Sequence, residues 1–154
     1  MARITSEQKE LNRQKYDKVI FDIFISEGWN EITFGRISKE LGISPSSLQR
    51  YYPTRVDFSK ALQGKVFPLV VGKLDLSSSS SFLTSWDLAL REGGMFASMI
   101  TMLIENSMSV HTNSHSVMGI RRLINALSQN MDNEEAERTV KLALGGSVFF
   151  FLNQ

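Results

Sequence analysis

The segment 44–50, with the sequence SPSSLQR, carries side chains that could hydrogen-bond to the edges of nucleic-acid bases. A guanidinium can donate two parallel hydrogen bonds to guanine, and a carboxamide can pair with adenine. If the segment is helical, Leu48 lies on the inner side and the outer side is polar. The polar positions are Ser46, Ser47, Gln49 and Arg50, and Pro45 stands at the leading end. Gln49 and Arg50 are therefore the first candidates for base recognition.

The histidines, His111 and His115, are the other residues at a spacing that suits chemistry. On a helix, a separation of four residues would place both on one face as metal ligands. The intervening residues 112–114 favour a loop instead, and further ligands are visible only as distant acids. We therefore expect neither a metal site nor a cofactor.

Sequence patterns of catalysis are not recognisable. The chain has no cysteine, which excludes disulfides, cysteine-ligated metals and thiol catalysis. No Ser/His/Asp set, paired carboxylate motif or glycine-rich phosphate loop is visible. The sequence therefore argues against an enzyme.

Residues 33–52 predict two short helices joined by a tight turn. Ile37 and Leu41 form an apolar pair one helical turn apart, and Gly42 stops the first helix where a positive φ is usually needed. Ile43 follows as an apolar plug.

The second of these helices begins at the next residues. Ser44 offers an N-cap oxygen, and Pro45 occupies the first helical position, where its missing N–H costs nothing. Leu48 then points back toward the first helix. This pattern is typical of a helix-turn-helix.

A longer helix is predicted before this pair. It has one buried face with apolar residues at helical spacing, and Gly28 closes it. The apolar residues are Tyr16, Val19, Ile20, Ile23 and Phe24.

After the pair, the sequence predicts a stop and a restart. Pro53 ends the helix, and Thr54 with Asp57 resembles a capping box. A fourth helix is expected through Phe58–Val66, which Pro68 should kink or end. The serine run 77–81 then suggests a flexible connection whose last serine caps the next helix.

The motif resembles the N-terminal domain of the tetracycline-repressor (TetR/AcrR) family of transcriptional regulators over about residues 10–62. The matching positions are Thr33, Ile37, Ser38, Leu41, Gly42, Ile43, Ser44, Leu48, Tyr51, Tyr52 and Arg55. The resemblance implies phosphate contacts at Thr33, Ser47, Tyr51 and Arg55. It also suggests that Lys9, Arg13 and Lys15 approach the DNA backbone. Gln49 departs from the family pattern, which most often has a tyrosine at that position.

The chain after residue 81 shows an aromatic and methionine-rich pattern at helical spacing. Two readings stay open, a packed core or a pocket for a small hydrophobic effector. The pocket candidates are Phe82, Trp86, Met95, Phe96, Met99 and Met102.

Two further helices are predicted at the C-terminal end, and an apolar cluster closes the chain. In the resembled family the last two long helices pair with their twofold mates, so this pair suits a homodimer, with burial inside one chain as the alternative. The interface candidates are Ile120, Leu123, Leu127, Ala143, Gly146, Ser147 and Phe150.

Charge and length complete the sequence-based expectation. The net charge is +1 over 154 residues, but residues 1–73 carry +4 and residues 74–154 carry −3, so the first half could face an anion. No signal peptide or membrane span is recognisable, which makes a cytoplasmic protein the default.

We expect an all-α protein with a helix-turn-helix DNA-binding domain at 1–53, its recognition helix near 45–52. A connecting helix and a short ligand-binding and dimerisation domain should follow at 54–154. The expected function is a dimeric DNA-binding regulator, a repressor released by a hydrophobic effector. The alternative is a helical interaction module without DNA binding or ligand.

Overall fold

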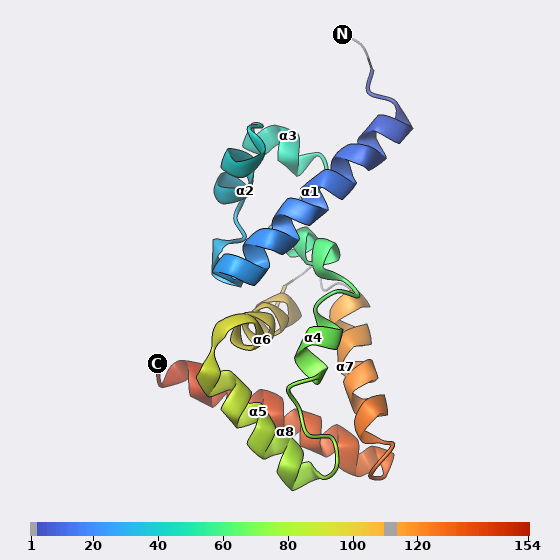
Figure 1. Cartoon of the computed structure of the whole chain (residues 1–154), viewed down its shortest axis with the longest axis vertical. Coiled ribbons are helices and arrows are strands. Elements are labelled where there is room, and N and C mark those ends of the chain that lie inside the picture. The colour runs from blue at the N-terminus through green and yellow to red at the C-terminus, as the bar shows by residue number, and fades with distance from the viewer. Residues whose placement is uncertain (1–2, 110–113) are drawn as a thin grey trace. The chain divides into compact units, whose positions relative to one another are not determined.

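The computed structural model describes residues 3–109 and 114–154, and the regular secondary structure of these residues is helical (Figure 1). The predicted all-α fold class is confirmed. The chain forms two compact units, Met1–Gln63 and Gly64–Gln154. The sequence predicts that the DNA-binding domain ends at residue 53. That boundary divides the chain by function rather than by compactness, and it stays a prediction. The pair weighed as a metal site, His111 and His115, lies outside the described side chains.

The first unit is built around one long helix. Its elements are α1 (Ser6–Glu27), η1 (Trp29–Glu31), α2 (Phe34–Leu41), α3 (Pro45–Gln49) and η2 (Arg55–Leu62), of which η1 and η2 are 3₁₀ helices. The hydroxyl oxygen of Thr5 accepts the backbone N–H of Gln8 at 3.1 Å and begins α1. Gly28, with φ of 91°, ends the helix, as predicted.

The turn between α2 and α3 has the predicted caps. Gly42 adopts the left-handed conformation with φ of 67°, which a residue with a Cβ rarely adopts. The Oγ of Ser44 accepts the backbone N–H of Ser47, and Pro45 stands in the first turn of α3. Leu48 is fully buried. The outer side of α3 is therefore held in place from beneath.

The regular part of α3 is shorter than expected. It ends at Gln49, and the chain continues as a turn in which the N–H groups of Tyr51 and Tyr52 bond to the carbonyl of Leu48, both at 3.0 Å. The following Pro53 disfavours a helical conformation at the residue before it, so the helix cannot continue.

The expected fourth helix is divided. Thr54 and Asp57 do form the predicted capping contact, since the N–H of Thr54 donates to the Asp57 carboxylate at 2.8 Å. However, η2 ends at Leu62, and Gly64 has φ of 74°. Pro68 stands in the first turn of α4 (Phe67–Val71), where its missing N–H breaks no hydrogen bond. The expectation that Pro68 kinks or ends the fourth helix was wrong, because that helix ends before it and Pro68 lies in the first turn of a separate short helix.

The second unit is a bundle in which α8 packs along α5 and α7. Its elements are α4, α5 (Ser79–Glu92), α6 (Gly94–Ser107), α7 (Ser114–Leu127) and α8 (Asn133–Leu152). Figure 1 shows α5 beside α8. The serine run is not a flexible connection, because Ser79–Ser81 already belong to α5. The predicted cap at the last serine was wrong, since Ser78 caps the helix by accepting the N–H of Ser81 at 3.1 Å. The hydroxyl of Ser79 donates to the carboxylate of Glu135 at 2.8 Å, which ties the first turn of α5 to α8.

A buried hydrogen bond crosses the centre of this unit. The indole N–H of Trp86 on α5 donates to the Oγ of Ser147 on α8 at 2.8 Å, and the two side chains are 2% and 0% exposed. Phe82 and Phe96 pack on the same indole, with ring centroids 5.5 and 5.1 Å away. A tryptophan can be buried this deeply because its N–H has a partner.

We expect Ser147→Ala to lower the free energy of unfolding by about 1–3 kcal/mol, because the Trp86 N–H would stay buried without an acceptor. Urea unfolding followed by tryptophan fluorescence measures the change. Thr84→Ala is the matched control, since Thr84 is exposed on α5 and bonds only to its own helix backbone. A loss for Ser147→Ala no larger than that of the control would contradict the role of this bond.

Candidate nucleic-acid interface

The structure places the candidate base-recognition residues on the outer side of α3 and at Arg50, the C-cap residue that directly follows it. Pro45, Ser46, Gln49 and Arg50 are exposed, while Leu48 on the inner side is fully buried. The side chain of Arg50 has no hydrogen-bond or ion-pair partner among the described residues. Its guanidinium is therefore available to an external acceptor.

The serines at the start of α3 are partly occupied by one another. The Oγ of Ser44 lies 3.1 Å from the Oγ of Ser46 and donates to the Oγ of Ser47 at 2.9 Å. Ser47 is half-buried and Ser46 is exposed. Of the two predicted contact serines, Ser46 is thus the better placed to meet a ligand.

Tyr51 and Tyr52 attach the end of α3 to α1. The Tyr51 ring meets Tyr16 edge to face with centroids 5.0 Å apart, and its hydroxyl accepts a hydrogen bond from Asn12 at 3.1 Å. Tyr52 is 2% exposed, and its hydroxyl donates to the carboxylate of Asp17. Burial raises the pKa of Tyr52 well above its ordinary value, and the hydrogen bond to Asp17 raises it further. The phenol therefore stays a neutral donor.

Sequence reasoning missed the partners of these tyrosines on α1. Asn12 and Asp17 are polar residues beside the predicted apolar stripe, and Asn12 lies one helical turn before Tyr16. That spacing was the available signal, but a contact 35 or 39 residues along the chain is visible only in the folded unit.

Arg55, a predicted phosphate contact, is already engaged inside the first unit. Its Nε donates to the carbonyl of Ile32 and a terminal nitrogen donates to the carbonyl of Trp29, both at 2.9 Å. Its guanidinium carbon also lies 4.7 Å from the centre of the Trp29 ring. The side chain therefore satisfies backbone carbonyls around η1, and its contact with phosphate stays a prediction.

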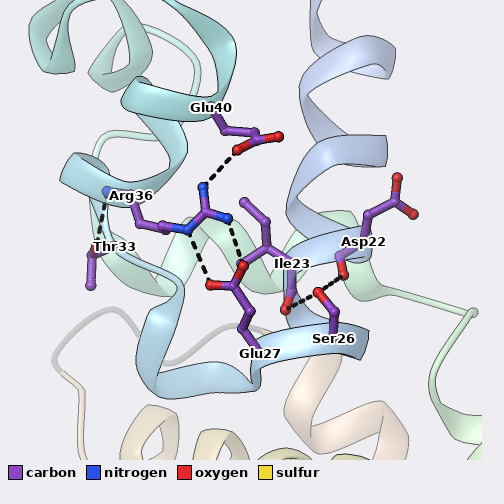
Figure 2. A network of polar contacts seen from close by, with 7 residues as sticks. All are labelled: Asp22, Ile23, Ser26, Glu27, Thr33, Arg36 and Glu40. Carbon is purple, nitrogen blue, oxygen red and sulfur yellow. Dashed lines mark hydrogen bonds and ion pairs between the residues drawn. The ribbon is translucent and has the colours of Figure 1, made fainter.

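Thr33, a predicted phosphate contact, and Arg36 lie at the start of α2. The Oγ1 of Thr33 accepts the backbone N–H of Arg36 at 3.1 Å and so caps α2. Figure 2 shows the Arg36 guanidinium held between Glu27 of α1, at 2.6 and 3.0 Å, and Glu40 of α2, at 2.8 Å. Hydrogen bonding from Arg36 holds the pKa of Glu27 below its ordinary value. This contact, which the sequence analysis missed, joins α2 to the end of α1 and occupies the cation.

The candidate pocket residues separate into two sets. Phe82, Trp86 and Phe96 are fully buried and pack on one another. The methionines of α6 are half-buried, and the helical spacing puts Met95, Met99 and Met102 on one face. The aromatic side chains fit the interpretation as a packed core. The effector pocket stays a prediction, and it depends on the methionines.

The candidate dimer residues also separate. Leu123, Leu127, Ala143 and Ser147 are buried within the second unit, Ile120 and Phe150 are half-buried, and Gly146 is exposed. The outward side of α8 is apolar as well, with Leu142, Phe149 and Leu152 exposed to 63%, 71% and 75%. Gly146 belongs to the predicted set, whereas Leu142, Phe149 and Leu152 do not.

Arg55 and Arg50 provide a matched pair for stability. We expect Arg55→Ala to lower the free energy of unfolding by about 1–3 kcal/mol, because it leaves buried carbonyl groups without their charged donor. Arg50→Ala should change it by no more than about 0.5 kcal/mol, since the side chain is exposed and makes no internal bond. Circular dichroism during urea unfolding compares the two. Equal effects of the two substitutions would contradict the internal role of Arg55.

The described residues limit the other classes of site. Among them, no group of three or more His, Asp or Glu side chains could hold a metal ion, and no helix is long and apolar enough to cross a membrane.

The second unit carries the family signal. Residues 63–151, more than half of the chain, match the family described as tetracycline repressor LuxT C-terminal domain. The match begins where the first unit ends, at Gln63. A comparison with curated proteins gives no match. The chain therefore belongs to the tetracycline-repressor family of regulators, with a C-terminal domain of the LuxT type.

Proposed function

We propose that the protein is a homodimeric transcriptional repressor that binds DNA through the outer side of α2 and α3. The carrying observation is the free guanidinium of Arg50, which is exposed at the end of α3. Gln49 and Ser46 are exposed on the same short helix, whose inner side is fixed by buried Leu48. Family membership adds the expectation of a regulator. A helix held in this way can enter a major groove with little further ordering.

The proposed contacts divide by chemistry. Arg50 and Gln49 read bases, because their side chains carry the donors and acceptors that distinguish base pairs. Thr33, Ser47, Tyr51 and Arg55 contact the sugar-phosphate backbone, which positions the helix without reading sequence. Pro45 and Ser46 stand at the leading end of α3, where they approach the groove first.

Replacing Arg50 tests this division. We expect Arg50→Ala to reduce the preference for the selected operator over random DNA by about 1–3 kcal/mol, because one bidentate base contact is lost. Binding sites are first selected from a random DNA pool, and affinities are then measured by fluorescence anisotropy at several salt concentrations. Arg91→Ala on α5 removes the same charge from an exposed position of the second unit and should leave the preference unchanged.

The outcomes of that measurement separate the candidate functions. If Arg50→Ala weakens operator and random DNA equally, Arg50 contacts phosphate rather than a base. If the wild-type protein shows no affinity for DNA even at low salt, the result rejects DNA binding and supports the alternative of a helical interaction module.

The outward side of α8 supports a second copy of the chain as partner. Leu142, Gly146 and Phe149 lie on one face by helical spacing, and the apolar side chains among them are exposed. Within the described part of the chain, a Cβ placed on Gly145 or Gly146 would meet no atom within 4 Å, so packing against those residues does not explain why these positions lack side chains. Small residues between apolar ones let the same helix of a second copy approach closely, as a twofold interface allows.

We expect Phe149→Glu to convert a dimer into a monomer at micromolar concentration, because a carboxylate would be buried at the twofold contact. Light scattering after size-exclusion chromatography gives the mass. Leu88→Glu on α5 is the control, since Leu88 is a similarly exposed apolar residue at 59% and should leave the dimer intact. A wild-type mass of one chain at this concentration would reject the dimer.

A hydrophobic effector is the remaining part of the proposal. Met95, Met99 and Met102 are half-buried on one face of α6, and flexible thioether side chains adapt to apolar ligands. An effector changes operator affinity only if it binds one conformation of the dimer better than another. Repeating the operator titration with decanoate as an apolar probe tests this class of ligand, and an unchanged affinity would count against it.

A further inference from the structure

A chain of hydrogen bonds leads from the first turn of α1 to Tyr51. The side-chain Nε2 of Gln8 donates to the Oδ1 of Asn12 at 3.0 Å, and the Nδ2 of Asn12 donates to the hydroxyl oxygen of Tyr51 at 3.1 Å. Gln8 and Asn12 are one helical turn apart, so α1 itself sets the first link. In this arrangement the Oδ1 of Asn12 faces Gln8 and its Nδ2 faces Tyr51.

This arrangement decides the direction of the Tyr51 hydroxyl. A phenol oxygen can accept hydrogen bonds and carries one proton to donate. Because the oxygen accepts the N–H of Asn12, its own proton is left for another acceptor, and none of the described residues supplies one. The ring cannot swing freely, since it is half-buried and packs edge to face on Tyr16.

A positive charge lies beside this donor. The ammonium group of Lys9 is 5.9 Å from the centre of the Tyr51 ring, and Lys9 is exposed. Tyr51 directly follows Arg50, the proposed base-reading residue. A phosphodiester oxygen accepts a hydrogen bond from an O–H donor and is attracted by a nearby cation. The position of Tyr51 and Lys9 beside Arg50 therefore suits a phosphate that flanks the groove.

We propose that Asn12, held by Gln8, is a positioning residue that directs the Tyr51 hydroxyl toward a backbone phosphate of the bound DNA. The proposal rests on the proposed DNA binding. Tyr51 makes the contact, and Asn12 acts only through it. The loss of Asn12 should therefore matter only while the Tyr51 hydroxyl is present.

A double-mutant cycle on DNA affinity tests this dependence. Tyr51→Phe should weaken binding to operator and random DNA by about tenfold, because one hydrogen bond to a charged oxygen is lost. Asn12→Leu should weaken it by about threefold, since the hydroxyl is then free to turn away. Added to Tyr51→Phe, Asn12→Leu should have no further effect. Asn125→Leu, at an exposed position of α7, is the control.

Two further variants separate direction from charge. In Asn12→Asp the carboxylate would accept the Tyr51 proton, so binding should fall at least as far as in Tyr51→Phe. Neither Asn12→Leu nor Tyr51→Phe should change the salt dependence, because both remove only neutral groups. Lys9→Gln should lower the slope of log affinity against log salt by about 0.9.

The results of the double-mutant cycle distinguish a failure of the positioning role from a failure of DNA binding. Losses that add in the double variant, or an Asn12→Leu protein that binds like wild type, would overturn the positioning role while leaving DNA binding intact. A wild-type protein without affinity for DNA would overturn the proposed function itself. Thermal unfolding of each variant identifies losses that come from reduced stability, which would also appear in the double variant as additive effects.

Discussion

The first unit depends on how a helix too short to be stable alone is held in place. The α3 helix has five residues, whereas isolated helices of fewer than about 12–15 residues are marginal in water. Two attachments compensate for this. Leu48 is buried beneath α3, and the tyrosines that follow it bond to α1. The outer side of α3 is therefore rigid because its inner side and its end are both fixed.

The same unit assigns different tasks to arginines that look alike in the sequence. Arg36 bonds to Glu27 and Glu40, and Arg55 donates to backbone carbonyls near η1. Arg50 has no such partner among the described residues and faces outward. A guanidinium that already donates to internal acceptors has fewer N–H groups left for a ligand. The number of free cations on the surface is thus smaller than the charge of this half suggests.

In the second unit, α8 has two apolar sides with different surroundings. The side that contains Ser147 packs on α5 and receives the Trp86 N–H, whereas the side that contains Phe149 and Leu142 is exposed. Burying a large apolar side chain stabilises by about 1.5–3 kcal/mol, so an exposed set on one helix face represents a considerable unused driving force. This is the physical basis for placing a second copy there.

The sequence by itself determined the local features. The stop at Gly42, the cap at Ser44, the proline in the first turn of α3 and the burial of Leu48 follow from backbone geometry and spacing over a few residues, and the structure confirms them. The family resemblance over the first unit and the family match over the second are likewise properties of sequence. Only the tertiary structure decided which polar groups are free. Contacts such as Asn12 with Tyr51, Arg55 with Trp29 and Trp86 with Ser147 join residues 26–61 positions apart, and local periodicity contains no information about such pairs. It also decided how the serine run is attached to the rest of the unit, because Ser79 bonds to Glu135 on α8, a helix that the local sequence around the serines does not reveal.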